Sequence, residues 1–350
     1  MIDYCIVGCG LAGIAFAETA LQNGKSIRVF DNSSQNSSTI AGGLYNPVIL
    51  KRFSEVWNAQ EQLSYLKEYN GKIEAKLNIK FNFNVPIYRK LFSVNEQNDW
   101  FVATDKINLS PFLSSSLIKK KYNGIDSPFG FGEVLQTGYV DTVVLLKEYH
   151  NYLKTLNLFS KDTFNYNLLD VNNKYIQYND LQFKNIVFAE GFGLSKNPFF
   201  NQLPLDGTKG ELLIIKAPNL NLDVVLKSSV FILPLGNDLF KVGATYNWLD
   251  KTNTPTQEGK KELEESLKNL LQCSYQIVEH LAGVRPTVKD RKPMVGSHPK
   301  HNNLHILNGL GTRGVMLAPK MALDLYNNIE NNIPLDINID IKRFKKINWI

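Results

Sequence analysis

Continuous apolar runs typical of buried parallel strands occur at the beginning, in the middle and near the end of the chain. They cover residues 3–7, 185–189 and 304–307. Small residues follow each run, and helix-forming segments follow the first and the last. A fully buried strand that leads into a turn and a helix is typical of a doubly wound parallel sheet. The pattern therefore predicts such a sheet, assembled from distant parts of the sequence.

Two intervals between these segments carry shorter runs in which apolar and polar residues alternate. This alternation predicts antiparallel strands at residues 81–85, 88–92, 211–215, 229–233 and 239–245. Further strand patterns cover residues 164–169 and 175–178, and helical patterns cover residues 55–77, 142–156, 257–272 and a segment ending near residue 329. Asp141 is well placed to cap the second of these helices.

The fold class is therefore α/β, or α+β over the whole chain. We expect a Rossmann-like nucleotide-binding domain with an inserted antiparallel-sheet domain that binds the substrate. The first comprises residues 1–80, 136–205 and 280–350, and the second comprises residues 81–135 and 206–279. Ligands should lie between the two domains.

Glycines follow the first apolar run at a spacing that suits a dinucleotide. Gly8 permits a tight turn, Gly10 lets the backbone approach a pyrophosphate, and Gly13 lets the helix pack closely on the strand. The phosphates would then lie at the N-terminus of a helix, where unpaired N–H groups favour negative charge. Asp31 ends the next strand, at the spacing expected for a carboxylate that binds a ribose 2′-OH. The motif predicts FAD or NAD rather than NADP.

Composition and charge narrow the class of protein. The 350 residues are 43% hydrophobic and 21% charged, which is enough to bury the cores of two domains. We expect no signal peptide, and no apolar run approaches the length of a membrane span. The three cysteines form no metal or disulfide pattern, which favours a reduced, cytoplasmic setting.

Basic residues exceed acidic ones by a modest margin. The formal charge is +6, with clusters at residues 119–121 and 342–346. Short basic runs are most often solvated surface, and we favour that interpretation. A basic surface that meets nucleic acid stays an alternative.

Several motifs together resemble one family of flavoenzymes. The glycine pattern and Asp31 are followed by Ala41-Gly42-Gly43-Leu44, Ala189-Glu190-Gly191 and residues 241–245, 283–286 and 311–319. Their order resembles that of the D-amino-acid oxidase/glycine oxidase family, over essentially the whole chain. The most similar subgroups are glycine and sarcosine oxidases and the FAD domain of the bifunctional enzyme that trims carboxymethylaminomethyl-uridine in tRNA. The methyltransferase domain of that bifunctional enzyme has no counterpart here.

The resemblance implies FAD, bound with its ring at the domain interface. The cofactor is expected to be noncovalent, because the cysteine that carries the flavin in sarcosine oxidases has no counterpart near Arg285. The implied FAD-binding residues are Gly8, Gly10, Leu11, Ala12, Gly13, Asp31, Asn32, Ala41, Gly42, Gly43, Leu44, Ala189, Glu190, Gly191, Arg285, Gly309, Gly311, Thr312, Arg313, Gly314 and Val315.

These relatives oxidise amines that carry a carboxymethyl group, and a buried arginine has the forked geometry to hold the carboxylate. The resemblance assigns this role to Arg285; the alternative is a structural pair with a carboxylate such as Asp290. Arg313 matches a second active-site arginine at the flavin edge. Lys241 resembles the lysine that activates oxygen in monomeric sarcosine oxidase, and an ordinary strand lysine is an equal alternative. No metal is expected.

Four further residues are expected to bind the substrate: Leu44, Tyr45, Phe231 and Tyr246. Phe231 and Leu44 stand where glycine oxidase carries a tyrosine and a methionine. This difference suggests an amine substituent that is larger or less polar than that of glycine. The histidines at 280, 298, 301 and 305 are expected in exposed loops and give no reason to propose a protein base.

The leading hypothesis is an FAD-dependent oxidase of a small amino acid or N-substituted glycine. Hydride would pass to flavin N5, and oxygen or another electron acceptor would reoxidise the flavin. One alternative is a tRNA wobble-uridine carboxymethylaminomethyl oxidase that uses the same chemistry, although tRNA is not the favoured partner. The other alternative is a non-catalytic flavin-binding subunit.

Overall fold

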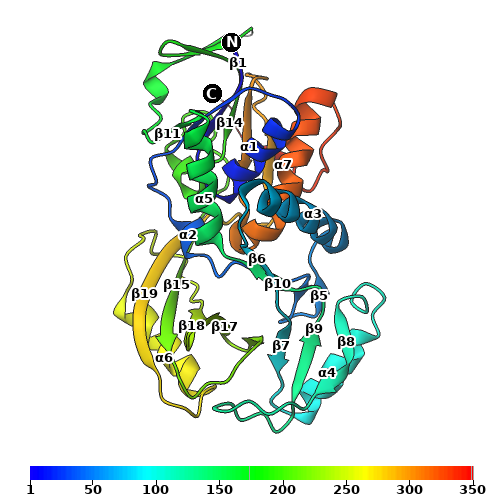
Figure 1. Ribbon diagram of the computed structural model, residues 1–350. Helices are drawn as coiled ribbons and strands as arrows, with labels where there is room; N and C mark the ends of the chain where they lie inside the picture. The colour runs from blue at the N-terminus through cyan, green and yellow to red at the C-terminus, as the bar shows by residue number, and fades with distance from the viewer. Residues whose placement is uncertain (173, 348, 350) are drawn as a thin grey trace.

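Two large sheets organise the chain, one near the termini and one at the opposite end (Figure 1). The computed structural model describes residues 1–172, 174–347 and 349. The first sheet has the order β11-β2-β1-β14-β13-β12, with β21 beside β14 and β20 beside β21. Its strands are β1 (Ile2–Val7), β2 (Ile27–Phe30), β11 (Phe159–Ser160), β12 (Leu169–Val171), β13 (Ile176–Tyr178), β14 (Leu181–Phe188), β20 (Met294–Ser297) and β21 (Leu304–Asn308).

The centre of the first sheet is parallel, as the apolar runs predict. Strand β1 pairs in parallel with β2 and β14, and β14 pairs in parallel with β21. Four helices lie together beside this sheet (Figure 1). They are α1 (Leu11–Gln22), α3 (Ala59–Leu77), α5 (Thr142–Thr155) and α7 (Gly314–Asn331). Asp141 caps α5, because its carboxylate accepts hydrogen bonds from Val143 N and Val144 N at 3.1 and 3.0 Å. The Rossmann-like architecture is confirmed.

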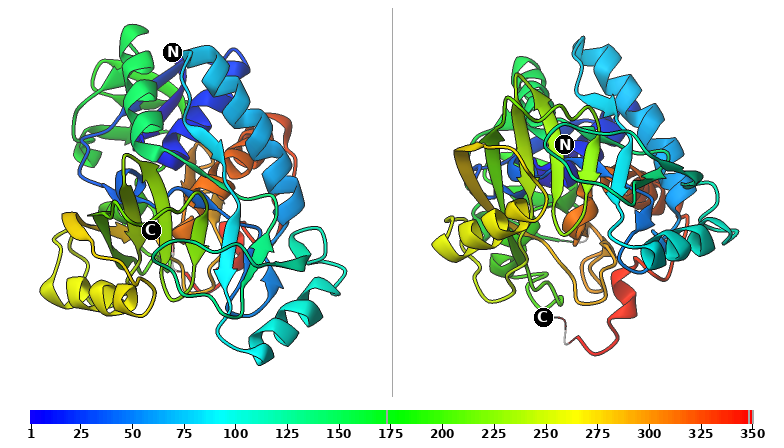
Figure 2. Two further views of the ribbon diagram at one scale, coloured as in Figure 1. Left: turned by 60° about the horizontal axis from the view of Figure 1, so that its bottom comes forward. Right: turned by 90° about the horizontal axis from the view of Figure 1, so that it is seen from below.

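The second sheet has the order β19-β15-β18-β17-β16-β7-β9-β8. Its pairs are antiparallel, except that β16 and β7 run parallel. Its strands are β7 (Ile87–Lys90), β8 (Leu113–Ile118), β9 (Phe131–Val134), β15 (Thr208–Lys216), β16 (Val225–Lys227), β17 (Phe231–Gly236), β18 (Leu239–Gly243) and β19 (Gln276–Arg285). Helices α6 (Gln257–Lys268) and α4 (Val94–Thr104) lie at opposite ends of this sheet (Figure 2).

Smaller elements connect the two large sheets. Strands β3 (Leu44–Tyr45), β10 (Gly138–Val140) and β6 (Asn82–Asn84) form a three-stranded sheet, β4 (Val48–Ile49) pairs with β5 (Ser54–Glu55), and α2 covers Ser37–Ile40. Strand β19 crosses the predicted boundary between residues 279 and 280, so it belongs to the antiparallel sheet up to Arg285. The division into two domains otherwise stays a prediction.

Local patterns were misleading at three places. Residues 94–104 form helix α4 within an interval expected to hold strands, and Ser93 caps it by accepting from Glu96 N at 3.2 Å. Residues 166–168, expected in a strand, form a 3₁₀ turn. The expectation of exposed histidines is wrong for His298 and His305, each only 2% exposed. His305 lies on β21, in the middle of a sheet, and burial lowers its pKa to about 3.

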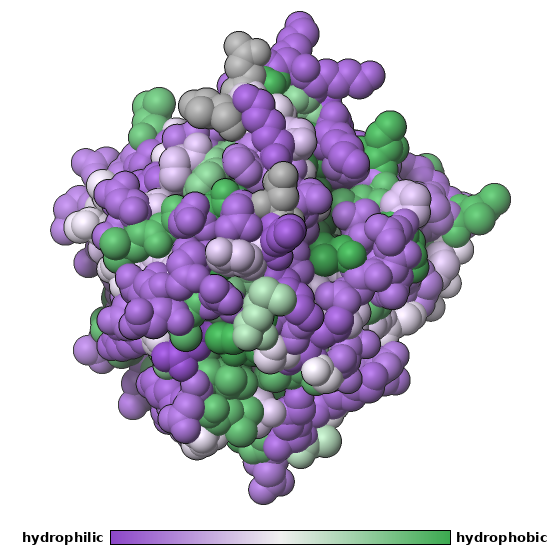
Figure 3. All heavy atoms as spheres, turned by 90° about the horizontal axis from the view of Figure 1, so that it is seen from above, coloured by the Kyte–Doolittle hydropathy of each residue, from purple (hydrophilic) through white to green (hydrophobic). Residues whose placement is uncertain are grey.

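The end of the molecule near the termini is mostly covered by polar side chains, with apolar ones in small groups (Figure 3). In the part of the chain that the structure describes, no helix combines the length and apolar character needed to cross a bilayer. Cys5, Cys9 and Cys273 are free thiols. The cytoplasmic setting stays a prediction.

Candidate functional site

One cavity of about 1470 Å³ runs from the first sheet to the second. Most residues expected at the site line it, and they come from segments far apart in the sequence. The expected residues that line it are Gly8, Gly10, Leu11, Ala12, Asp31, Asn32, Ala41, Gly42, Gly43, Leu44, Ala189, Glu190, Gly191, Phe231, Tyr246, Arg285, Gly309, Gly311, Thr312, Arg313, Gly314 and Val315. Gly13, Tyr45 and Lys241 do not appear among the described residues of its wall.

The turn between β1 and α1 leaves no room for side chains. Gly8 has φ +96°, and a Cβ there would lie 2.4 Å from Ala189 O. A Cβ at Gly13 would lie 1.9 Å from Gly8 O, so Gly13 acts behind the cavity by letting α1 approach the strand. At Gly10 a Cβ would meet Ser38 Oγ at 2.9 Å. The N-terminus of α1 therefore turns backbone N–H groups toward the cavity, and Leu11 N also donates to Ser38 Oγ at 3.3 Å. A helix N-terminus of this kind can bind phosphate.

Asp31 is fixed by the same turn. Its carboxylate accepts hydrogen bonds from Cys9 N at 2.5 Å and from Ser33 N at 2.6 Å. A carboxylate has about four acceptor positions, so two remain for ligand hydroxyls on the cavity side. This is the geometry expected for binding a ribose.

Glu190 is a buried acid in the cavity wall. Burial raises its pKa to about 7, although hydrogen bonds from Asn197 Nδ2, at 2.7 Å, and from the Tyr166 hydroxyl lower it. Through these two hydrogen bonds, Glu190 holds the segment after β14 against the 3₁₀ turn of residues 166–168.

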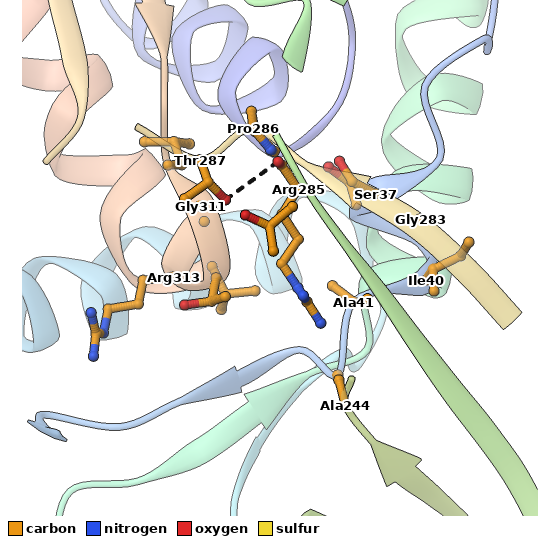
Figure 4. A pocket seen from close by; sticks show the side chains of 18 of the residues that line it. Ser37, Ile40, Ala41, Ala244, Gly283, Arg285, Pro286, Thr287, Gly311 and Arg313 are labelled. Carbon is orange, nitrogen blue, oxygen red and sulfur yellow. Dashed lines mark hydrogen bonds between the residues drawn. The ribbon is translucent and has the colours of Figure 1, made fainter. Parts of the chain in front are cut away.

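Arg285 lies at the end of β19 and points into the cavity (Figure 4). Its guanidinium crosses Gly210, where a Cβ would lie 1.8 Å from Arg285 Nη2. Its Nη1 donates to Thr245 O at 3.2 Å, and its Cζ lies 4.6 Å from the Tyr246 ring centroid. Burial lowers its pKa. No carboxylate forms an ion pair with it among the described residues.

The structural alternative for Arg285 is wrong. Asp290 instead pairs with Arg343, whose Nε lies 2.9 Å from the carboxylate. The guanidinium of Arg285 is thus held in place by backbone and an aromatic ring, and the donors not used by Thr245 O are free to bind a carboxylate.

Arg313 reaches the cavity from the turn before α7. Gly311 N donates to Pro286 O at 3.0 Å, which ties this turn to the segment that follows Arg285. The guanidinium of Arg313 points away from that of Arg285 in the close-up (Figure 4). Burial lowers its pKa as well. The cavity therefore holds two cations on different sides.

Phe231 packs on the loop after α2. A Cβ at Gly42 would lie 2.6 Å from Phe231 Cζ, so the loop passes close to the aromatic ring. Lys241 Nζ donates to Ala41 O at 3.2 Å, below this loop. Burial lowers the pKa of Lys241. Tyr45 donates from its hydroxyl to Asn84 Oδ1 at 3.0 Å, within the small sheet. The roles of Lys241 and Tyr45 stay predictions.

Sequence reasoning missed three residues of the cavity wall. Gly210 on β15 is paired with Gly283 on β19. Two glycines at one register position leave space above the sheet, and this pair could have indicated that a side chain crosses there. Lys227 and Arg89 also line the cavity, and they meet because β16 pairs with β7. No local pattern predicts that contact between distant segments.

A family model described as FAD dependent oxidoreductase (DAO) matches residues 3–325. The chain belongs to this family. Among curated relatives, the glycine oxidase of Bacillus subtilis is 22% identical over 352 residues, which covers 93% of each chain. The bifunctional tRNA 5-methylaminomethyl-2-thiouridine biosynthesis protein of Marinobacter nauticus is 28% identical over 200 residues, which covers 51% of this chain and 31% of that protein.

Solved structures of the same fold cover nearly the whole oxidoreductase. Glycine oxidase from Bacillus cereus has a TM-score of 0.74 at 18% identity, covering 95% of this chain and 96% of that one. Iminodiacetate oxidase from Chelativorans sp. BNC1 has a TM-score of 0.76 at 15% identity, covering 96% and 98%. These likenesses confirm the fold class.

The site fits the FAD of this oxidoreductase family. The helix N-terminus at Gly10 has backbone N–H groups that suit the pyrophosphate, and the carboxylate of Asp31 suits a ribose. The cavity continues from there past Gly42 to Arg285, so it has room for an extended dinucleotide. Bound FAD supplies a two-electron acceptor, and the protein supplies orientation and electrostatics.

Proposed function

We propose that this FAD-dependent oxidoreductase oxidises the C–N bond of a small amino acid or N-substituted glycine. Arg285 binds the substrate carboxylate and presents the adjacent C–H to the flavin. Loss of that hydrogen with its electron pair leaves an imine, which water hydrolyses to a keto or aldehyde acid and an amine. Similarity to a glycine oxidase and to an iminodiacetate oxidase supports this substrate class.

The observation that carries the proposal is the position of Arg285 over Gly210. A guanidinium that is buried without an ion-pair partner is costly, and a bound carboxylate offsets that cost. The Tyr246 ring on one side and Thr245 O on the other limit the directions in which a carboxylate can approach. The remaining donors of the fork suit a bidentate contact.

The test is anaerobic reduction of the bound flavin by N-alkyl glycines, followed by absorbance. Arg285→Ala should retain FAD and lose affinity for the amine by about 100-fold or more, since a charge-assisted bidentate contact is lost. Arg285→Lys should recover part of the affinity. The matched control is Arg28→Ala, whose side chain bonds Asn157 O and Ser160 Oγ away from the cavity. Equal affinity in Arg285→Ala and the wild type would remove Arg285 from the site.

A second candidate is oxidation of a carboxymethylaminomethyl group on a tRNA wobble uridine. It is supported by the partial match to the bifunctional tRNA enzyme and by the exposed Lys51 and Arg52, which line the cavity. This chemistry is the same at Arg285, so the two candidates differ only in what the amine nitrogen carries. Binding of tRNA that weakens steeply with salt would favour this candidate.

A further inference from the structure

Phe231, Lys227 and Arg89 form a row across three neighbouring strands. Lys227 is opposite Phe231 in the β16–β17 pair and opposite Arg89 in the β16–β7 pair. Residues opposite one another in a ladder share a face of the sheet. All three line the cavity, and Lys227 Nζ lies 5.9 Å from the Phe231 ring centroid. The row therefore places two cations beside the aromatic residue expected at the substrate.

Lys227 forms no hydrogen bond or ion pair with its side chain in the part of the chain that the structure describes. Burial, and to a smaller extent the charge of Arg89, lower its pKa to about 8. Arg89 donates to Leu50 O and lies over the Phe53 ring, with Cζ 4.9 Å from the centroid. Two neighbouring half-buried cations without a carboxylate between them are unfavourable unless an anion binds.

The surroundings add positive charge. Lys51 and Arg52 are exposed and line the same cavity, which places further cations where it opens to solvent. Glu96 is the carboxylate of this part of the wall, and it accepts a hydrogen bond from Phe92 N at 3.1 Å. Burial lowers the pKa of Arg89, and the charges of Glu96 and Asp99 only partly offset this effect. Glu96 forms no ion pair with either cation among the described residues.

We propose that Lys227 and Arg89 bind an anionic group, a phosphate or a carboxylate, at the far end of the substituent on the substrate nitrogen. This inference rests on the proposed function, in which Arg285 binds the first carboxylate. It makes the substrate an N-substituted glycine with anions at both ends, and Phe231 contacts the part between them.

The spacing of the strands in the second sheet sets the length expected for that substituent. The guanidinium of Arg285 lies over Gly210 on β15, and Lys227 is on β16. Strands β15, β18, β17 and β16 are neighbours in that order, so three strand spacings, about 14 Å across the sheet, separate the strands beneath the two anion sites. This distance exceeds the size of a simple N-methyl or N-carboxymethyl glycine. It suits a substituent of nucleotide size, either free or within RNA.

The experiment compares two synthetic amines with the FAD-loaded protein. N-hexylglycine has one anionic end, and an N-carboxymethyl aminohexyl phosphate has two. Their dissociation constants come from anaerobic flavin reduction. The wild type should bind the phosphate-bearing amine about tenfold or more tightly, the gain expected for charge-assisted hydrogen bonds. Lys227→Met should remove this preference, so that the two dissociation constants become about equal, and Lys227→Arg should retain it.

Lys216→Met is the matched control, because Lys216 is exposed at the end of β15 and lies outside the cavity wall. It should keep the wild-type preference. An equal preference in the wild type and Lys227→Met would overturn the proposal. If Lys227→Met does not fold, Arg89→Gln replaces it, with the same expected loss of preference.

Hexyl phosphate separates this inference from the proposed function. Calorimetry should show that the wild type binds hexyl phosphate about tenfold more tightly than Lys227→Met. This result supports the anion site even if neither amine reduces the flavin, and equal binding overturns it even if both do. The last measurement tests whether an unmodified tRNA anticodon stem–loop competes with hexyl phosphate for the protein. Competition identifies RNA as the source of the anionic group. Absence of competition identifies a small molecule as the source.

Discussion

The guanidinium of Arg285 crosses the sheet directly over Gly210, where a Cβ would lie 1.8 Å from Nη2. Gly210→Ala should therefore displace the guanidinium and weaken substrate binding by about tenfold or more, because a bidentate contact depends on orientation. The affinity for N-alkyl glycines should be measured by flavin reduction. Gly71→Ala is the control, since a Cβ there meets nothing within 4 Å. Unchanged affinity in Gly210→Ala would show that substrate binding does not depend on the position of the guanidinium over residue 210.

Asp31 accepts two backbone hydrogen bonds and faces the cavity. Asp31→Asn retains one acceptor oxygen and should weaken FAD binding by about 10- to 100-fold, the effect of losing charge-assisted hydrogen bonds. The FAD dissociation constant can be measured by flavin fluorescence on reconstitution. Asp180→Asn, at an exposed turn, should leave it unchanged. Equal constants for the Asp31 variant and the wild type would contradict the assigned role.

Lys241 is buried below the loop of Ala41, and burial lowers its pKa. If it stabilises negative charge as oxygen is reduced, Lys241→Met should slow flavin reoxidation about 100-fold and leave anaerobic reduction nearly unchanged. Stopped-flow absorbance measures both half-reactions, with Lys216→Met as the control. Similar slowing of both half-reactions would assign Lys241 a structural role.

Burial raises the pKa of Glu190 to about 7, from the 4.5 of a glutamate in water. A raised pKa means that the folded state holds the proton more tightly than the unfolded chain does. Protonated Glu190 therefore contributes favourably to the free energy of unfolding below the pKa of the unfolded chain. This contribution is lost as the pH rises through 7. Glu190→Gln cannot lose a proton. The wild type should therefore lose up to about 3 kcal/mol relative to this variant between pH 4.5 and pH 8.5.

Denaturation with urea at several pH values measures this difference. Glu258→Gln, on the exposed face of α6, is the control and should show no such dependence. A constant difference between Glu190→Gln and the wild type over this range would mean that Glu190 ionises normally in the folded state.

The elements that sequence reasoning recovered depend on local chemistry. Gly13 must be glycine because of Gly8 in the same strand–turn–helix unit, whereas Gly8 and Gly10 lie against other segments. The spacing of the three glycines was still enough to predict the turn. Asp141 likewise caps a helix that begins at the next residue. Arg285 was identified from the motif around it, and its environment agrees with that assignment.

The elements that were missed depend on contacts between distant segments. Lys227 and Arg89 meet because β16 and β7 pair across more than a hundred residues. His305 carries no sign of burial in its own segment, and only the positions of β14 and β20 on either side enclose it. Helix α4 was hidden because its apolar residues are few, and Trp100 anchors it against Gly132 on β9.

The backbone hydrogen bond from Gly311 N to Pro286 O has a consequence for how the enzyme family diversifies. It joins the strand that ends in Arg285 to the turn that carries Arg313, so the main-chain positions of the two arginines are tied to each other. Replacement of the side chains at Phe231 or Leu44 leaves this backbone link intact. If the proposed function holds, such replacements should change the accepted amine while Arg285 keeps its place.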